Sequence, residues 1–365
     1  MNTTSETPLL SSLLIESELN DLKNVINKAV SSDIDLRSFF KDLFRFSASN
    51  HCTYAASGEN RTHPLLALNS LKNLAALRLD SPSRPIVEKA IEICHHSQAS
   101  DDSLAKIELR QEELDQPLFT QDFLRAVVEG DAEKARCEAA KIAVVSDNYV
   151  AVIEMIMEVA THHMDELGTF VYGVYRSAVF GGEKEPEPFM NLLLTEVTKQ
   201  PRPIETADLS GDDSLYPFLG DVLKNSDDRD FSLFSTALRL WETDSPRQSG
   251  YRKGLKLWAE QQFKSKPLTE ENDNLRKKSS VNSIIKAIKD NNPAQLTHFL
   301  SRARAADDWS WTTELAESWI KSFKTEESDF LLLDSLQSLT RAVPENFIPL
   351  LAGRLLQVNL SISER

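Results

Sequence analysis

The sequence is poor in cysteine and glycine and has no long uninterrupted apolar segment. It contains only 3 cysteines and 11 glycines in 365 residues. Because Cys52, Cys94 and Cys137 lie far apart, with no Cys-x-x-Cys pair, the sequence predicts neither a disulfide framework nor a zinc finger. The apolar runs fall short of the ~20 residues that a membrane span needs, and residues 1–8 lack the basic segment that opens a signal peptide. We therefore expect a soluble protein of the reducing cytoplasm with no membrane partner.

Basic residues are outnumbered, and the common catalytic motifs are missing. The 41 Lys and Arg residues against 56 Asp and Glu residues give a formal net charge of −15. Binding to nucleic-acid phosphates requires a basic surface, so we expect no nucleic-acid partner. The sequence contains no G-x-G-x-x-G, G-x-x-x-x-G-K-[ST], G-x-S-x-G or H-E-x-x-H pattern. No sequence motif therefore supports a dinucleotide-binding protein, a P-loop protein, an α/β-hydrolase or a zincin.

Helical periodicity dominates what the sequence does contain. Leu, Ala, Glu and Lys recur at three- and four-residue spacing, while no segment alternates apolar and polar residues between hairpin turns. Pro64 and Pro85 each stand in the first turn of a predicted helix, where the missing N–H costs nothing. We expect helices over 65–79, 85–96, 121–129, 132–145 and 149–167. The predicted fold class is all-α, built from stacked helical hairpins.

Solvated connections separate these helices. They are rich in Asp, Glu, Ser, Pro and Lys, as exposed loops should be. The predicted loops span 98–117, 199–214, 242–250 and 265–278. The loop 199–214 is the best candidate for a boundary between two parts of the chain.

A weak internal repeat supports that boundary. Segment 123–131 can be laid on segment 284–292, and each is followed by further amphipathic helices. We interpret this as two similar halves, 18–200 and 210–360, packed into one compact body after a flexible segment 1–17. The alternative is that any two helical hairpins resemble each other in this way.

Histidine and tryptophan are divided unequally between the two halves. Six of the seven histidines precede residue 180, and all five tryptophans follow residue 240. Chemistry that uses imidazole therefore belongs to the first half. We interpret Trp309, Trp311 and Trp319 as packing for the last helices, with a ligand-stacking surface as the alternative.

Two histidines fall on apolar helix faces. His63 stands at the start of a helix that is apolar nearly all round and so should be buried, with Asn69, Ser70 and Asn73 as polar exceptions. The positive end of the helix dipole favours neutral imidazole there, the form that a base or a metal ligand needs. His163 projects onto the apolar face of a later helix. For both residues the alternative is a core histidine that only hydrogen-bonds a backbone group.

Other groups resemble parts of metal sites. Glu92 and His95 are spaced as Glu-x-x-His, which ferritin-like di-iron bundles use twice, but only one clean copy is present. An acidic stripe with four-residue spacing is formed by Glu154, Glu158, His162 and Glu166. Because the opposite face of that helix is apolar, we interpret the stripe as a solvated surface. Cys94 projects onto an apolar face and is expected to be a small core residue.

The segment 63–71, His-Pro-Leu-Leu-Ala-Leu-Asn-Ser-Leu, followed by a helix that ends in two histidines, resembles part of the questin oxidase-like family. It is also similar to uncharacterised bacterial all-helical proteins with a His-x-x-x-x-x-Asn-Ser motif. In these a later helix carries Gly-His before an apolar run; here the matching pair is Gly168-Thr169, so that histidine's role is not carried over unless His163 compensates. The resemblance spans about 60–180. It implies oxidative chemistry on an aromatic polyketide-like molecule, with NADPH or iron as candidate cofactors.

The leading hypothesis is an oxidase-like helical protein with an apolar small-molecule pocket in the first half. His63 would be base or ligand, His163 a second imidazole and Tyr172 a polar group at the pocket wall. His63, His163 and His95 are the candidate metal ligands. The competing hypothesis is a non-catalytic helical-repeat protein that presents an acidic surface to a basic protein partner. A third is that the histidines are relics of an ancestral site. The oligomeric state is left open.

Overall fold

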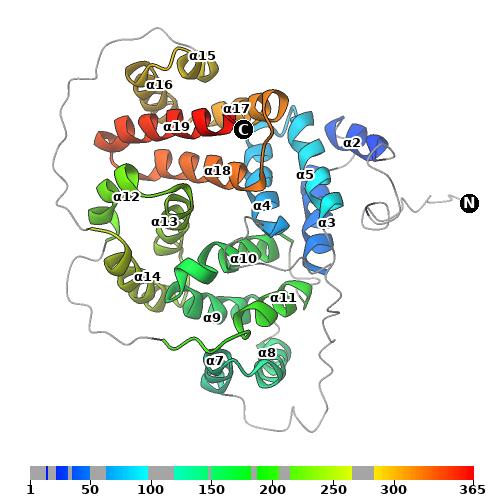
Figure 1. The fold of residues 1–365 in the computed structure, drawn as a ribbon. Coiled ribbons are helices and arrows are strands. Elements are labelled where there is room, and N and C mark those ends of the chain that lie inside the picture. The colour runs from blue at the N-terminus through cyan, green and yellow to red at the C-terminus, as the bar shows by residue number, and fades with distance from the viewer. Residues whose placement is uncertain are drawn as a thin grey trace, which may run out of the picture.

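The fold is known from a computed structural model. It describes residue Leu14 and residues 22–31, 35–49, 63–97, 119–146, 149–181, 187–204, 214–264 and 283–365. Every regular element in these ranges is a helix, and no strand occurs among them (Figure 1). The prediction of a compact all-α fold is therefore confirmed. No helix among these residues is long and apolar enough to cross a lipid bilayer.

Nine helices are described before residue 205. They are α2 (Lys23–Val30), α3 (Leu36–Ser49), α4 (Pro64–Ala75), α5 (Arg84–His96), α7 (Thr120–Glu129), α8 (Ala132–Ser146), α9 (Tyr149–Thr161), α10 (Thr169–Gly181) and α11 (Glu187–Val197). A 3-10 turn, η1 (Ala76–Arg78), extends α4 to nearly the predicted length, and a π-helical turn, η2 (Met164–Gly168), joins α9 to α10.

The regular elements that follow residue 213 are also helices. They are α12 (Leu219–Asn225), α13 (Asp228–Trp241), α14 (Gln248–Gln262), α15 (Ile284–Lys289), α16 (Pro293–Ala305), α17 (Ser310–Ser322), α18 (Glu327–Ala342) and α19 (Ile348–Ser363). The 3-10 turns η3 (Tyr216–Phe218) and η4 (Glu345–Phe347) lead into α12 and α19.

Several predicted connections fall where little or nothing is described. The loops 98–117 and 265–278 lie outside the described residues, as does the segment 1–17 except for Leu14. Most of the predicted boundary loop 199–214 lies outside them as well. The loop predicted at 242–250 is shorter than expected, because α14 already begins at Gln248.

The helix predicted over 149–167 is broken, and that prediction was wrong. α9 ends at Thr161, and the backbone of His163 (φ −131°, ψ 47°) leaves the helical region before the π-helical turn begins. At the end of this turn, the Met164 side chain packs directly on residue 168, which leaves space for glycine only. A Cβ atom at position 168 would lie 2.5 Å from the Met164 sulfur. The apolar periodicity continues through the break, which is why the sequence did not indicate it.

Helix α4 lies at the centre of the molecule. All of its residues except Asn73 are buried, as its all-round apolar pattern predicts. It contacts α3, α5 and α10 on one side and α17 and α18 on the other. Figure 1 shows α4 beside α10 and α18 near the middle of the fold. The packing of α4 against α18 therefore joins the early and the late parts of the chain.

The tryptophans of the later helices are packing residues. Trp319 is fully buried and donates its indole N–H to the Asn359 side chain at 2.9 Å. Trp258 on α14 donates to the Asp165 carboxylate at 2.8 Å, which holds α14 against η2. Indole groups bury a large apolar area while satisfying one donor, and these do both.

The segments aligned in the sequence form the same turn. In the hairpin of α7 and α8, the N–H of Asp131 donates to the Ala126 carbonyl at 2.9 Å, after Gly130 with φ 76°. In the hairpin of α15 and α16, the N–H of Asn292 donates to the carbonyl of the corresponding residue, Ala287, after Asn291 with φ 45°. Both turns use a left-handed residue to end the first helix.

This turn gives a matched pair of substitutions. Gly130→Ala should lower the free energy of unfolding by about 1–2 kcal/mol, because the left-handed backbone disfavours a Cβ atom, which would also lie 3.2 Å from the backbone of Gln200 and Pro201. Asn291→Gly should be neutral or stabilise by up to about 1 kcal/mol, because it removes that strain. Urea unfolding of both variants measures the difference, and equal destabilisation would contradict the interpretation.

Candidate functional site

A hollow lies where α4, α10, α13 and α18 meet. Helices α4 and α10 line it with Leu66, Asn69, Ser70, Thr169, Tyr172 and Gly173. Helices α13 and α18 line it with Ser232, Thr236, Arg239, Leu331, Asp334 and Ser335. Its enclosed volume is about 40 Å³, room for a few water molecules, within a total of about 380 Å³ that includes space open to solvent. Six of these twelve residues carry a hydroxyl group, although more of the surface that faces the hollow is apolar than polar. We expected an apolar pocket within the first half, whereas this hollow lies between helices of both parts of the chain.

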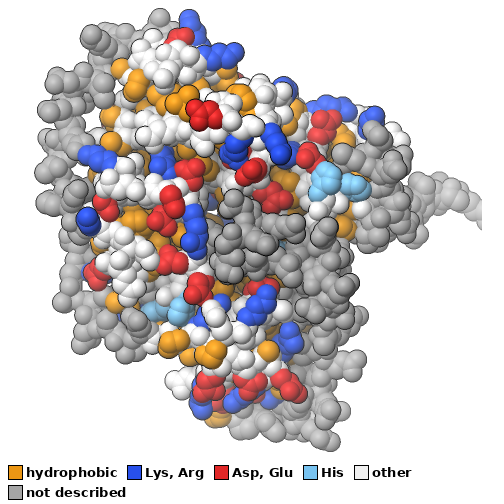
Figure 2. All heavy atoms as spheres, in the orientation of Figure 1, with side chains coloured by type: hydrophobic (Ala, Val, Ile, Leu, Met, Phe, Trp, Pro, Cys, Tyr) orange, Lys and Arg blue, Asp and Glu red, His pale blue; other side chains and the backbone are white. Residues whose placement is uncertain are grey.

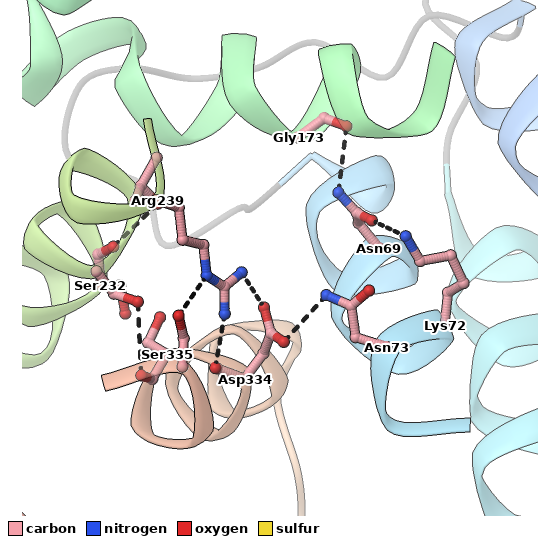
Figure 3. Close-up of polar contacts among 11 residues, drawn as sticks. Asn69, Lys72, Asn73, Gly173, Ser232, Arg239, Asp334 and Ser335 are labelled. Atoms are coloured by element: carbon pink, nitrogen blue, oxygen red, sulfur yellow. Dashed lines mark hydrogen bonds and ion pairs between the residues drawn. The ribbon is translucent and has the colours of Figure 1, made fainter. Parts of the chain in front are cut away.

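An ion pair forms one side of the hollow. The Arg239 guanidinium donates to the Asp334 carboxylate at 2.7 Å and to the Asp334 carbonyl at 2.8 Å. It also donates to the Ser338 hydroxyl and interacts with Tyr172. Figure 3 shows Arg239 and Asn73 reaching the carboxylate from opposite sides, the Asn73 amide at 3.0 Å. These bonds connect α13, α18 and α4.

The charge of this arginine is fixed by its partner. The Arg239 and Asp334 side chains expose only 23% and 9% of their surface. Burial disfavours the charged guanidinium, but the negative charge of Asp334, the interaction with Tyr172 and the hydrogen bonds to both together outweigh burial and raise the pKa of Arg239. The pair is therefore internally neutral, with most of its donors and acceptors occupied.

A second polar group continues from the hollow into α4. The Asn69 amide donates to the Gly173 carbonyl at 3.4 Å and its oxygen accepts from the Lys72 ammonium at 2.7 Å (Figure 3). The Lys72 nitrogen also lies 4.9 Å from the centre of the Phe180 ring. Burial and the positive charge of Arg176 lower the pKa of Lys72 to about 8. A part of these lysines is therefore neutral near pH 7 to 8.

Gly173 sets how closely α10 approaches α4. A Cβ atom at this position would lie 2.2 Å from a methyl carbon of Leu66. Leu66 and Gly173 both line the hollow, so the absence of a side chain at 173 brings the two helices together at its wall.

His63 is buried, as predicted, but it caps a helix. Its Nδ1 accepts a hydrogen bond from the backbone N–H of Leu65 at 3.2 Å, and its ring packs edge-on against Phe170 at 5.5 Å. The acceptor role of Nδ1 places the proton of a neutral ring on Nε2. His63 is not among the residues that line the hollow. These contacts agree with the alternative that His63 is a core histidine bonded to a backbone group. A role as base or metal ligand stays a prediction.

The other predicted imidazoles lie elsewhere. His163 is half-buried in the break after α9, with Nε2 3.0 Å from the Pro203 carbonyl. His95 is half-buried at the end of α5, where its ring contacts that of His96. No group of three or more His, Cys, Asp and Glu residues in the described ranges is placed to hold a metal ion. The predicted ligand set His63, His163 and His95 therefore forms no three-ligand metal centre, because the three rings belong to separate elements.

The remaining predicted residues have clear places. Tyr172 lines the hollow, and its role there stays a prediction. Cys94 is a buried core residue. The acidic stripe is solvated only in part. Helix α14 packs on its α9 portion, where Glu158 pairs with Arg247 at 2.7 Å and Gly250 approaches Glu158 closely. Glu166, beyond α9, is exposed as expected.

Sequence reasoning missed the ion pair at the hollow. Arg239 and Asp334 are separated by 95 residues and belong to no motif, so no local pattern indicates that they meet. Asn69 and Asn73 were visible as polar exceptions on an apolar helix, and this signal could have located the α4 wall. Lys72, on the same apolar helix, carried the same signal.

The ion pair predicts a large loss of stability when one partner is removed. Asp334→Ala should lower the free energy of unfolding by about 2–4 kcal/mol, because the largely buried Arg239 loses its counter-charge. Glu88→Ala, which removes one partner of the exposed pair of Arg84 and Glu88, is the control and should cost less than about 1 kcal/mol. The double variant Arg239→Met with Asp334→Leu should recover most of the loss. Urea denaturation measures all three, and an Asp334→Ala cost no larger than the control's would contradict the assignment.

Lys72 predicts a specific pH dependence. Its pKa is about 8 in the folded chain against an ordinary value of 10.5, so between these values the unfolded chain binds more protons and stability rises with pH. Lys72→Met should therefore stabilise the fold by up to ~3 kcal/mol at and below pH 8, and this advantage should shrink towards pH 10.5. Lys321→Met at an exposed position is the control. Unfolding at pH 7 to 10 measures the difference, and a pH-independent advantage would refute the prediction.

Comparison with known proteins adds no relative. No protein-family model, curated protein or solved structure matches this chain.

Proposed function

We propose that the chain binds a small, uncharged organic molecule with hydroxyl or carbonyl groups in the hollow between α4, α10, α13 and α18. The observation that carries the proposal is the convergence of six hydroxyl side chains from four helices on one hollow. A hydroxyl group both donates and accepts hydrogen bonds, so such a wall suits ligand hydroxyls and carbonyls alike. Leu66 and Leu331 add apolar surface for a ring or chain.

The ion pair favours an uncharged ligand. Arg239 and Asp334 neutralise each other, and their main hydrogen-bonding groups are already occupied by protein atoms. A ligand carboxylate would have to displace Asp334 to reach the guanidinium, at the cost of a buried unpaired charge. Neutral hydroxyl and carbonyl groups avoid that cost.

The reaction class is an oxidation, as the resemblance to the questin oxidase-like family implies. Aromatic polyketide-like molecules carry ring hydroxyls and carbonyls, the groups that this wall suits. Thr169, which stands where the similar bacterial proteins carry a histidine, lines the hollow. His63 packs on the adjacent residue, Phe170, and lies one turn before Leu66. Among the predicted imidazoles it is therefore the one best placed to serve this hollow.

The hollow gives less support to the cofactors that the resemblance implies, iron and NADPH, than to the ligand. The described residues provide no three-ligand metal group, so no step of the proposal uses iron. NADPH enters only through the family resemblance. Elemental analysis and an optical spectrum of protein purified without chelators test the oxidase part: bound iron or a chromophore supports it. A colourless, metal-free protein that does not consume NADPH with a hydroxylated aromatic substrate would refute it.

A second candidate function is a non-catalytic interaction protein for a basic partner. The net charge of −15 favours it. On the face shown in Figure 2, however, acidic and basic side chains are interspersed rather than gathered into one acidic patch. Recovery of a stoichiometric basic protein whose binding weakens with salt would support this candidate.

Filling the hollow should abolish ligand binding. Calorimetry with 1,8-dihydroxynaphthalene should detect binding to the native chain and much weaker binding of naphthalene. Ser232→Leu should weaken binding by at least about tenfold, or about 1.4 kcal/mol, because a larger side chain occupies the hollow. Ser361→Leu, at an exposed position on α19, is the matched control and should bind normally. Equal affinity of the two variants would exclude the hollow as the binding site.

A further inference from the structure

Four helices of the first half recur in the second at an interval of 161 residues, and α4 and α5 recur at 164. α9 and α17 both span 13 residues, from Tyr149 and from Ser310. The same interval separates the first residues of α8 and α16, the first residues of α11 and α19, and the last residues of α10 and α18. The order of α4, α5 and α7 to α11 is thus repeated by α13, α14 and α15 to α19.

Contacts within the first set of helices recur in the second. α10 contacts α4, and α18 contacts α13. α11 contacts α3, and α19 contacts α12. α9 contacts α7, and α17 contacts α15. Most corresponding helices therefore have corresponding neighbours, which similar order alone would not produce. The exception is α9, which packs closely on α8 and α11, whereas α17 packs closely on neither α16 nor α19.

Contacts between the two sets are reciprocal. α4 packs on α18, and its counterpart α13 packs on α10, the counterpart of α18. Likewise α5 packs on α17, and α14 packs on α9. Reciprocal contacts of this kind are the property of a two-fold interface, where i meets j and j meets i. Repeats stacked by translation would touch their neighbours in one direction only.

Hydrogen bonds between the central helices also occur in corresponding pairs. The Asn69 amide on α4 donates to the Gly173 carbonyl on α10 at 3.4 Å. The Ser235 hydroxyl on α13 donates to the Ser335 carbonyl on α18 at 3.5 Å. Asn73 on α4 binds Asp334 across the interface, and its counterpart Arg239 interacts with Tyr172, the counterpart of Asp334.

The hollow is lined by corresponding residues from both sets. The hydrogen bonds above relate α4 to α13 at an interval of 166 residues and α10 to α18 at 162, and these two intervals pair most of the wall. The pairs include Leu66 with Ser232, Ser70 with Thr236, and Tyr172 with Asp334. A cavity lined by equivalent positions of two related units lies on the axis that relates them.

We propose that the two halves are an internal duplication related by a pseudo-two-fold axis, and that the ligand site lies on this axis. Ser70 and Thr236 then hold opposite edges of one ligand, which carries hydroxyl or carbonyl groups at both edges. The ligand part of this inference rests on the proposed function, whereas the axis does not. The pairing is unequal, because the ion pair of Arg239 and Asp334 corresponds to the uncharged Asn73 and Tyr172. The more polar edge of the ligand therefore faces α13 and α18.

An experimental structure of the full chain tests the axis without any ligand. Superposing residues 64–181 on residues 228–342 should require a rotation close to half a turn and should match α4, α5 and α7 to α10 with their counterparts. A rotation far from half a turn, or helices that fail to match, would overturn the axis.

Two substitutions that remove one hydroxyl each test the ligand site. Ser70→Ala and Thr236→Val should each weaken binding of 1,5-dihydroxynaphthalene, whose hydroxyl groups lie on opposite edges, by about the same factor, near tenfold. With 1-naphthol, which has one hydroxyl, only one of the two variants should lose affinity. Ser361→Ala is the exposed control, and circular dichroism verifies that each variant is folded. If only one variant affects the dihydroxy probe, the ligand lies to one side and the on-axis site is wrong. If the native chain binds neither probe, the proposed function and the ligand part fail together, while the superposition still decides the axis.

Discussion

The ion pair between Arg239 and Asp334 is the interaction on which the centre of this fold depends. Withdrawing two charges from water is costly, and the cost is offset only when the partners satisfy each other's hydrogen-bonding groups. Here the guanidinium reaches a carboxylate, a backbone carbonyl and the Ser338 hydroxyl, and the carboxylate also accepts from Asn73. Because these groups come from three helices, satisfying the pair fixes how α4, α13 and α18 lie together.

The polar centre contrasts with the helices that carry it. α4 is buried nearly all round, and a helix used only for packing would have no reason to place Asn69 and Lys72 inside. Each of these groups needs a partner, and the partners lie on α10 or on α4 itself. A hollow lined by hydroxyl groups leaves room for further partners that are not part of the chain. This is the physical basis for proposing a binding site at this place rather than at the scattered imidazoles.

Local patterns in the sequence predicted much of the fold. Proline at position 64, apolar periodicity over the next turns and Gly130 each mark a helix boundary that the structure contains. The break at His163 was invisible because apolar spacing runs through it. The site was predicted least well: burial of His63 follows from composition, but the meeting of Arg239 and Asp334 depends on how distant helices pack. Contacts between helices far apart in sequence leave no local trace, so only their separate polar exceptions could be seen.

Gly173 shows how little is needed to change such a site. Its missing side chain lets α10 lie against Leu66, while the corresponding residue on the other side of the hollow is Ser335. The two walls therefore differ in how they accept a larger side chain. At Gly173 the neighbour that must move is the flexible Leu66 side chain, whereas position 335 already carries the serine side chain. A single substitution at residue 173 would change the distance between α4 and α10, and so the width of the hollow, without replacing any of its polar side chains. In the proposed function, the residue at position 173 therefore sets the width of the ligand site, while the six hydroxyl-bearing residues set its hydrogen-bonding chemistry.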